Sequence, residues 1–366
     1  MKNLKSLQKS DFGRLVHVLQ EDGYSVAAPV EAGGVLAVRP IESVEEIARG
    51  YRDEQAPGRY RVEDVGDELY FGNAVGAESA KRFFFPAEND LFTARVDGDH
   101  FVLDRMADDP PRWALIGVRP CDLAAIRTQD RVFDAHDESG AVFRCESETY
   151  YTRAREEAFL VAVNCTAPGG NCFCASWGTG PEAREGFDLA LTEVGGAFLL
   201  QPGSHRGEAV LDRLPVRDAE PSEIELAELK ISRAREHMGK RVDRDGLPEL
   251  LARNVEHRIW DWFSHHCMGC GNCTMVCPTC FCSTVTDSTD LATGAATRTR
   301  RWESCYTHQF SYVTSGPVRS GTSARYRHWL THKLGTWWEQ FGSSGCVGCG
   351  RCMTWCPVGI DWTKEV

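Results

Sequence analysis

Two copies of one cysteine motif constrain this chain of 366 residues more than any other feature of its sequence. The first copy is CMGCGNCTMVCP at residues 267–278, and the second is CVGCGRCMTWCP at residues 346–357. In both copies the cysteines are three, three and four positions apart, and a proline follows the fourth. This spacing is typical of loops that hold four-iron clusters. The motifs therefore predict two [4Fe-4S] clusters in the C-terminal half of the chain.

The spacing also predicts which cysteines share a cluster. Three closely spaced cysteines can wrap one cluster, whereas the cysteine before the proline points away and ligates the other cluster. We therefore assign one cluster to Cys267, Cys270, Cys273 and Cys356, and the second to Cys346, Cys349, Cys352 and Cys277. The alternative metal is zinc, but structural zinc prefers two separated pairs of ligands, and this pattern fits that preference poorly.

A third group of cysteines follows two apolar runs. Cys121 comes after WALIGV (113–118), and Cys165, Cys172 and Cys174 come after AFLVAV (158–163). Both runs have the length of strands, and ligand sites in open α/β sheets lie beyond the carboxyl ends of the strands. If the two strands are neighbours, these cysteines form a third [4Fe-4S] site. The alternative is that they are small buried apolar residues, as free cysteine often is.

The remaining four cysteines are harder to assign. Cys280, Cys282 and Cys305 could hold a fourth centre, but only with a further ligand that the sequence does not identify. We prefer to interpret them as reduced thiols that pack near the second cluster. Cys145 lies too far away in the sequence to be assigned to any group.

Composition and charge exclude several classes of protein. Lys and Arg number 41 against 53 Asp and Glu, and the net charge of −12 makes nucleic acid a poor ligand. The N-terminus lacks the apolar run of a secretory signal, and no apolar run is long enough to span a bilayer. We therefore expect a cytoplasmic protein without direct membrane insertion. In that reducing compartment, metal ligation explains 16 cysteines better than disulfides do.

The pattern of apolar residues predicts an α+β protein with two domains. Residues 1–220 alternate between strand-like and helix-like stretches, which indicates a mixed α/β domain with the additional iron–sulfur site. Residues 221–366 are expected to form an α-helical, ferredoxin-like dicluster domain. Two stripes at helical spacing support this expectation: they consist of Leu247, Leu251, Val255, Ile259 and Phe263, and of Tyr326, Leu330, Leu334, Trp337 and Phe341.

Residues 283–345 are rich in Arg and Lys and include Lys333. We expect these side chains on a solvated face. The alternatives are a docking surface for an acidic partner, or contacts that stabilise the charge of a reduced cluster.

Several catalytic and nucleotide-binding motifs are absent from the sequence. It has no G-x-G-x-x-G after a strand, no G-x-x-x-x-G-K-[ST] loop, no C-x-x-C-H and no H-E-x-x-H. We therefore predict no catalytic residues and no cofactor site beyond the clusters. Such a chain would pass electrons within an oxidoreductase complex without an active site of its own.

Four segments carry a resemblance to a known family: GVRPCDLAAI, VNCTAPGGNCFCASWGTGP, CPTCFC and CVGCGRCMTWCP, in this order. They resemble the beta subunit of soluble NiFe hydrogenases of the sulfhydrogenase, NADP-linked type, and the corresponding subunit of anaerobic sulfite reductase is similar. The resemblance spans residues 80–366. It implies [4Fe-4S] clusters at the two ferredoxin-like motifs, and it strengthens the third site because the upstream cysteines fall within the shared segments.

The resemblance also implies partners and a function. The partners are a flavin and [2Fe-2S] subunit that binds NAD(P)H, and the small and large subunits of a hydrogenase. The predicted function is that of an iron–sulfur subunit relaying electrons between the hydrogenase module and the flavin subunit, in a complex of hydrogen:NADP+ type. One alternative is the corresponding subunit of anaerobic sulfite reductase. An alternative of a different class is a zinc-binding interaction scaffold.

Overall fold

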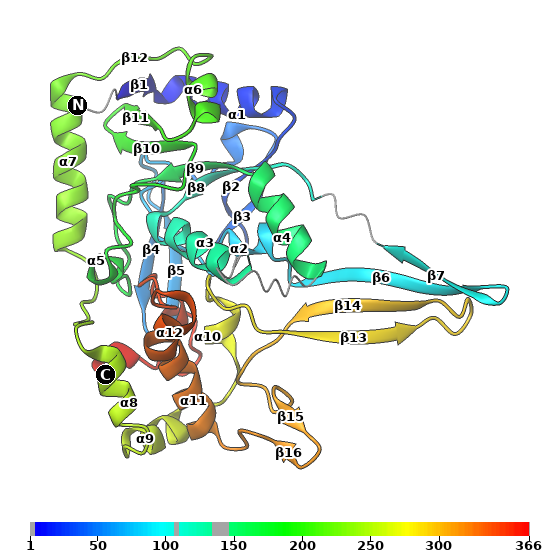
Figure 1. Ribbon diagram of the computed structural model, residues 1–366. Coiled ribbons are helices and arrows are strands. Elements are labelled where there is room, and N and C mark those ends of the chain that lie inside the picture. The colour runs from blue at the N-terminus through cyan, green and yellow to red at the C-terminus, as the bar shows by residue number, and fades with distance from the viewer. Residues whose placement is uncertain (1–3, 106–109, 134–145, 366) are drawn as a thin grey trace.

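An eight-stranded mixed sheet organises the N-terminal half of the protein (Figure 1). The computed structural model describes residues 4–105, 110–133 and 146–365, so Cys145 lies outside the described residues. The strands of this sheet are β1 (Lys5–Gln8), β2 (Ser25–Glu31), β3 (Leu36–Pro40), β8 (Trp113–Val118), β9 (Phe159–Val163), β10 (Leu189–Val194), β11 (Ala197–Pro202) and β12 (Arg217–Asp218). Their order across the sheet is β12-β1-β11-β10-β9-β8-β2-β3.

The centre of this sheet is parallel and buried. Strands β2, β8, β9 and β10 run parallel to one another, and every residue of β9 is buried. Parallel strands are covered on both faces, which explains why they read as continuous apolar runs in the sequence. The strands expected at 113–118 and 158–163 are thus confirmed, and they are neighbours. The adjacent pair β10 and β11 is an antiparallel hairpin that turns at Gly195 and Gly196.

Helices cover both faces of the sheet. They are η1 (Lys9–Asp11), α1 (Phe12–Glu21), η2 (Val44–Glu46), α2 (Lys81–Phe84), α3 (Pro120–Phe133), α4 (Glu146–Glu157), α6 (His205–Leu211) and α7 (Pro221–Glu236). The short helix α5 (Cys174–Trp177) instead packs against residues of the C-terminal half. The side chains of β9 alternate between two hydrophobic clusters: Phe159 and Val161 belong to one, and Leu160 and Ala162 to the other. Because successive side chains of a strand point to opposite faces, each face of the sheet has its own core.

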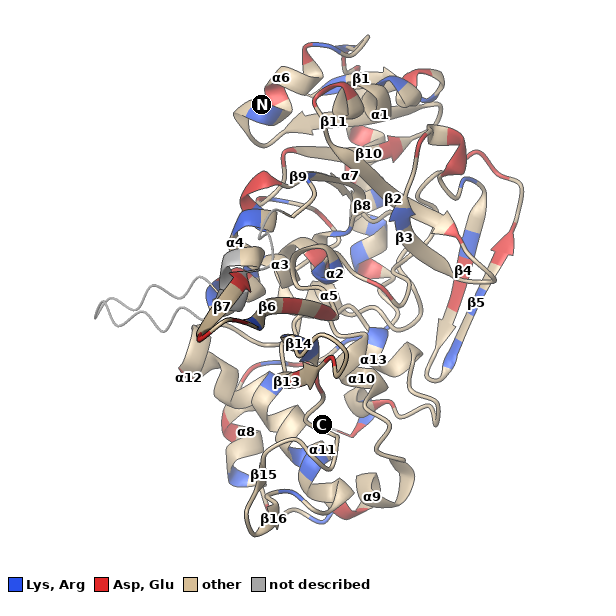
Figure 2. Ribbon diagram, turned by 90° about the vertical axis from the view of Figure 1, so that its right-hand side faces the viewer, with Lys and Arg blue, Asp and Glu red and all other residues tan. Residues whose placement is uncertain are grey.

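A second sheet projects from the body of the molecule (Figure 1). Its strands are β6 (Glu88–Asp97), β7 (His100–Arg105), β13 (Ser283–Thr289) and β14 (Ala296–Trp302), in the order β13-β14-β6-β7. Its central pair joins residues far apart in the sequence, since Ala94 lies opposite Ala296. Two separate hairpins are β4 (Tyr51–Ala56) with β5 (Arg59–Asp64), and β15 (Tyr312–Val313) with β16 (Gly316–Pro317). Figure 2 views the projecting sheet from its tip, with β4 and β5 standing apart.

These strands correct one part of the predicted fold class. The mixed α and β content is confirmed, but residues 221–366 are not α-helical throughout, because β13 to β16 lie within them. Periodicity missed β13 and β14 because both strands consist mostly of polar residues, which leaves no apolar stripe. The division at residue 220 remains a prediction, and the projecting sheet joins strands from both sides of it.

Short helices surround the two cysteine motifs. They are α8 (Leu247–Arg253), α9 (Ile259–His266), α10 (Asn272–Met275), α11 (Thr322–Thr331), the π-helix η3 (His332–Thr336), α12 (Trp337–Phe341), α13 (Arg351–Thr354) and η4 (Trp362–Lys364). The stripe from Tyr326 to Phe341 is confirmed as α11, η3 and α12 in succession. The single helix expected from Leu247 to Phe263 is wrong, because the chain leaves the helix after Arg253 and Val255 is 43% exposed.

Candidate metal centres

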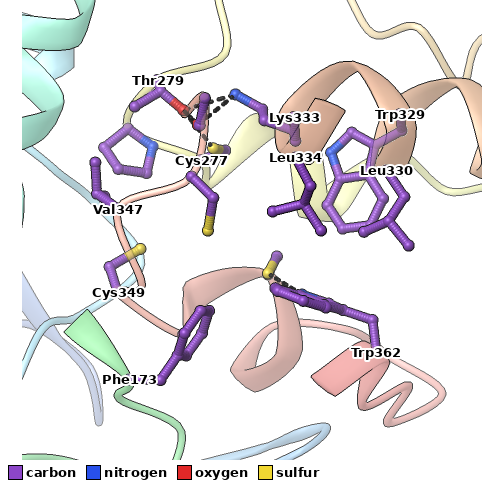
Figure 3. Close-up of a pocket in the computed structure, with 15 residues that line it drawn as sticks. Phe173, Cys277, Thr279, Trp329, Leu330, Lys333, Leu334, Val347, Cys349 and Trp362 are labelled. Carbon is purple, nitrogen blue, oxygen red and sulfur yellow. Dashed lines mark hydrogen bonds between the residues drawn. The ribbon is translucent and has the colours of Figure 1, made fainter. Parts of the chain in front are cut away.

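Two adjacent cavities in the C-terminal half are surrounded by cysteines. We call the cavity at Cys267, Cys270, Cys273 and Cys356 site 1, and the cavity at Cys277, Cys346, Cys349 and Cys352 site 2. These are the two sets that the motif spacing predicts, with three thiols from one motif and the fourth from the other. Figure 3 shows site 2, where the sulfur atoms of Cys277 and Cys349 point into the cavity.

The two cavities share a wall and differ in exposure. Trp329, Cys352 and Trp362 line both of them. Site 1 lies near the surface, because Cys270 is exposed. Site 2 is enclosed by apolar side chains such as Phe173, and its Cys349 is only 8% exposed. Site 1 is therefore the outer site and site 2 the inner site.

The loop geometry is repeated in the two motifs. Gly269 and Gly348 both have a φ of 68°, in the left-handed region that favours glycine. The N–H of Gly269 donates to the Cys267 sulfur at 3.4 Å, and the N–H of Gly348 donates to the Cys346 sulfur at 3.4 Å. Such hydrogen bonds stabilise the negative charge of a thiolate and tune the potential of an iron–sulfur cluster.

The four thiols of each site surround a cavity and are not close enough together to bind one metal ion. Within residues 4–105, 110–133 and 146–365, no group of three or more His, Cys, Asp or Glu side chains is placed to hold a single metal ion. Burial raises the pKa of the Cys346 thiol to about 12, so this thiol is protonated at neutral pH unless a metal displaces the proton. Four thiols around an enclosed apolar cavity, with N–H donors to their sulfurs, fit a cubane cluster.

Site 3, at Cys121, Cys165, Cys172 and Cys174, lies beyond the carboxyl ends of β8 and β9. Burial, followed by the charge of Cys165, raises the pKa of the Cys172 thiol to about 12. Burial also raises the pKa of Cys174, and the next largest contributions come from Cys165 and Cys172, which are therefore close neighbours. Cys121 packs with Cys174 and with Cys349 of site 2 in one buried cluster. The structure thus gathers the predicted third set beside site 2, with Cys121 and Cys174 on the side that faces it.

Two charged groups that the sequence analysis did not single out hold site 3 in place. A guanidinium nitrogen of the buried Arg119 lies 3.8 Å from the Cys165 sulfur. Arg351 of the second motif donates hydrogen bonds of 2.6 and 2.9 Å to the two carboxylate oxygens of Asp122, and both side chains are buried. Because Asp122 follows Cys121, this ion pair fixes the loop of site 2 against the start of α3. Breaking one partner of such a buried pair costs about 3–5 kcal/mol.

Cys280, Cys282 and Cys305 lie next to sites 1 and 2. The thiol of Cys280 hydrogen bonds with Cys277, and that of Cys282 hydrogen bonds with Cys305. The Cys280 thiol is the largest of the influences that hold the pKa of Cys277 well below its ordinary value. This placement agrees with thiols packed beside the second site, and their state remains a prediction.

Two buried lysines lie beside the cysteines of site 2, and the sequence pointed only to Lys333, as one of several basic residues that could contact a reduced cluster. Lys333, expected on a solvated face, is 5% exposed and lines site 2, so that expectation is wrong for this residue. Its ammonium group donates to the Thr279 hydroxyl at 2.6 Å, and that hydroxyl lies 3.2 Å from the Cys277 sulfur (Figure 3). Lys81 donates to the carbonyl oxygens of Cys277 and Cys280 at 3.1 and 3.3 Å. No sequence pattern could identify Lys81, which is 196 positions from Cys277.

Burial and the thiols act on these lysines in opposite directions. Burial by itself lowers the pKa of Lys333, but the neighbouring cysteines, Cys277 foremost, raise it above its ordinary value. For Lys81 burial prevails, and it lowers the pKa to about 8. Lys333 is therefore a permanent positive charge beside site 2, whereas the pKa of Lys81 places its titration near pH 8.

Comparisons with known proteins agree with this geometry. A family model described as a 4Fe-4S dicluster domain matches residues 266–360, which hold both motifs. The chain is 31% identical over 333 residues to sulfhydrogenase 2 subunit beta of Pyrococcus furiosus, across 88% of this chain and 92% of that protein. The chain belongs to the sulfhydrogenase beta-subunit family. The resemblance expected from the four segments is thereby confirmed.

Family membership and the dicluster domain together describe an iron–sulfur, electron-transfer subunit of hydrogenase type. No solved structure matches the chain. Among the helices in the described parts of the chain, none is both long enough and apolar enough to cross a membrane.

Proposed function

We propose that this chain relays single electrons through [4Fe-4S] clusters held at sites 1, 2 and 3, within a NiFe hydrogenase complex. The observation that carries the proposal is the pair of cavities in which the two motifs exchange their fourth cysteine. Clusters held by such ligands accept and release one electron at a time. The residues that would hold them are the twelve cysteines of the three sites.

The sites lie in a row, which suits a relay. Sites 1 and 2 share the wall that contains Cys352, and Cys349 of site 2 packs in the same cluster as Cys121 and Cys174 of site 3. The row begins near the surface at Cys270 and ends in the interior of the N-terminal half. We propose that site 1 is one terminal of the relay.

The other side chains have electrostatic roles in this proposal. Phe173 and Trp362 exclude water from site 2. The positive charge of Lys333 offsets the negative charge that four thiolates bring into a medium of low dielectric constant, where an unpaired charge is costly. The indole N–H of Trp362 donates to the Cys352 sulfur at 3.4 Å. These contacts favour the reduced, more negative form of site 2.

The proposed partners follow from the family. The relative is named as subunit beta of a sulfhydrogenase, and this chain has no nucleotide-binding motif of its own. We infer that small and large hydrogenase subunits stand at one end of the relay, and a flavin and [2Fe-2S] subunit that binds NADP(H) at the other. A flavin is needed because it splits a hydride into the single electrons that clusters accept. The proposed compartment is the cytoplasm.

The alternatives make different predictions. The corresponding subunit of anaerobic sulfite reductase would assemble with a sirohaem protein, and the 31% identity to a sulfhydrogenase subunit favours the hydrogenase complex. A zinc scaffold would contain zinc without sulfide and would show no redox activity.

Metal and sulfide analysis of anaerobically purified protein tests the proposal. Three cubanes contain about twelve iron and twelve sulfide per chain. The double variant Cys172→Ala with Cys174→Ala should lower both counts to about eight, whereas Cys282→Ala should leave them unchanged. Dithionite should reduce the isolated protein, and NADPH should do so only after the flavin subunit is added. If the wild-type protein contains only about eight iron and eight sulfide per chain, site 3 holds no cluster. Zinc without sulfide would overturn the proposal.

A further inference from the structure

A groove on the surface of the protein leads to site 2. It consists of two adjoining hollows of about 870 and 240 Å³, which share Trp177, Arg244, Trp338 and Ser344. Helices α8 and α12, which lie close together in Figures 1 and 2, line the larger hollow. The smaller hollow extends to α3 and to Cys346. We call the two hollows together the Trp–Arg groove.

The smaller hollow carries an excess of positive charge. Arg127 and Arg131 project from α3, and Arg244 joins them from the segment before α8. Glu185 lines the same hollow and pairs with Arg127. Within the described part of the chain, Arg131 and Arg244 donate only to backbone carbonyl oxygens, those of Gly342 at 3.4 Å and Trp177 at 3.3 Å. Neither guanidinium group therefore has a carboxylate partner among residues 4–105, 110–133 and 146–365, in a chain whose net charge is −12.

The pKa of Arg127 reflects the same excess of positive charge. Burial, followed by the charge of Arg131, lowers the pKa of Arg127. Arg127 and Arg131 are four positions apart on one helix, where like charges repel each other. A carboxylate placed between Arg131 and Arg244 would relieve this repulsion, and Arg is the side chain best shaped to bind one.

The larger hollow has an apolar wall that is only partly covered, and the carboxylates of Asp245, Glu249 and Glu339 line the rest of it. Trp338 is 45% exposed, although its neighbour Trp337 is 1% exposed. Leu247, Leu251 and Val255 form the opposite wall, and Val255 is 43% exposed. Exposed tryptophan beside arginine is the composition of the residues that contribute most to binding in protein interfaces.

The floor of the groove is bonded directly to the loop of site 2. The indole N–H of Trp177 donates to the Ser344 hydroxyl at 2.9 Å, and the backbone N–H of Cys346 donates to the same hydroxyl at 3.0 Å. Cys346 and Val347 themselves line the groove. A protein seated in the groove therefore lies against the inner site of the relay, which is otherwise enclosed.

We propose that the Trp–Arg groove docks a segment of an electron-exchanging partner protein, with one carboxylate of that segment in the smaller hollow between Arg131 and Arg244 and an apolar side chain against Trp338 in the larger hollow. This rests on the proposed function, because it takes site 2 as a redox centre. Each electron that site 2 gains is one that the partner's centre loses, and no bond forms or breaks. The Trp–Arg groove is then a second terminal of the relay, in addition to the exposed site 1.

The test uses the purified native complex and the remainder of that complex after this chain has been removed. Binding of the remainder is compared for wild type, for Arg131→Glu with Arg244→Glu, and for a matched control, Arg61→Glu with Arg233→Glu, which reverses two exposed arginines on β5 and α7. Reversing the charges of Arg131 and Arg244 at an interface should raise the Kd about tenfold or more and weaken the dependence of the Kd on salt concentration. Trp338→Ala should also raise the Kd, and the control should match wild type.

Hydrogen exchange and iron content complete the test. In the native complex, backbone amides of 334–346 should exchange more slowly than in the isolated chain. Unprotected amides there, or an unchanged Kd for the groove variant, would overturn the docking proposal. Iron content is measured for every variant, so loss of clusters is distinguished from loss of docking. If wild type lacks iron, the proposed function fails, while the Kd values still report on the groove.

Discussion

The backbone of Gly348 touches the backbone of Cys174, so that a Cβ added to Gly348 would lie 2.6 Å from the Cα of Cys174. The N–H of Phe173 donates to the carbonyl oxygen of Gly348 at 2.9 Å across the same contact. The loop of site 2 and the loop of site 3 are therefore packed together without room for a side chain. This contact, more than either motif alone, is what makes the sites neighbours.

Gly348→Ala should separate these two loops. Gly269 provides a matched control, because it occupies the same position in the first motif with the same φ of 68° but has no neighbouring atom within 4 Å of an added Cβ. Both alanine variants carry backbone strain of about 1–2 kcal/mol, and overpacking adds about 1–3 kcal/mol to Gly348→Ala alone. The iron–sulfur absorbance of Gly348→Ala should disappear at lower urea concentration than that of Gly269→Ala. Equal urea midpoints would show that the contact is not tight in solution.

Lys333→Met should lower the reduction potential of site 2. Removing a buried positive charge beside the thiolates makes an added electron less favourable, and a change of ~1.4 kcal/mol corresponds to about 60 mV for one electron. The control is Lys364→Met, which removes a lysine whose side chain is 73% exposed. A redox titration followed by electron paramagnetic resonance measures both. A Lys333→Met potential equal to that of wild type would exclude an electrostatic role for this residue.

The potential of site 2 should also depend on pH through Lys81. Burial lowers the pKa of Lys81 to about 8, so its positive charge is present below that pH and is lost as the pH rises through it. Loss of a positive charge disfavours reduction, so the potential should fall between pH 7 and pH 9 by about 60 mV, the one-electron equivalent of ~1.4 kcal/mol. Lys81→Met should start at the lower value and show little change over the same range. A wild-type potential that stays level across this range would contradict the assignment.

Cys356→Ala should damage site 1, although Cys356 belongs to the second motif. Cys267, Cys270 and Cys273 would remain, and the spectrum should show a three-iron cluster or loss of iron at site 1, while site 2 keeps its iron. Cys352→Ala is the comparison from the same motif and should affect site 2 first, because Cys352 is one of its four ligands in our assignment. If Cys356→Ala removes only the iron of site 2, each motif closes on its own cluster.

The sequence by itself was sufficient for features that depend on local spacing. The motif cysteines divide into the two sets around two cavities, because the cysteine before the proline is directed away from its own loop by local backbone geometry. The strands before Cys121 and Cys165 were predicted from unbroken apolar runs, whereas their parallel pairing was seen only in the structure. The family followed from four short segments, and iron ligation by these cysteines stays a prediction that iron analysis tests.

Only the tertiary structure decided which distant residues meet. Lys333 resembles other basic residues in its segment, yet the helix around it turns the side chain into site 2, where its charge is paired with thiols. The pairing of β6 with β14 joins strands about 200 positions apart, and the polar sequence of β14 carries no sign of its partner. Burial of a charge and pairing of strands depend on contacts between segments, and the free energy of such contacts is set by the whole fold rather than by the local sequence.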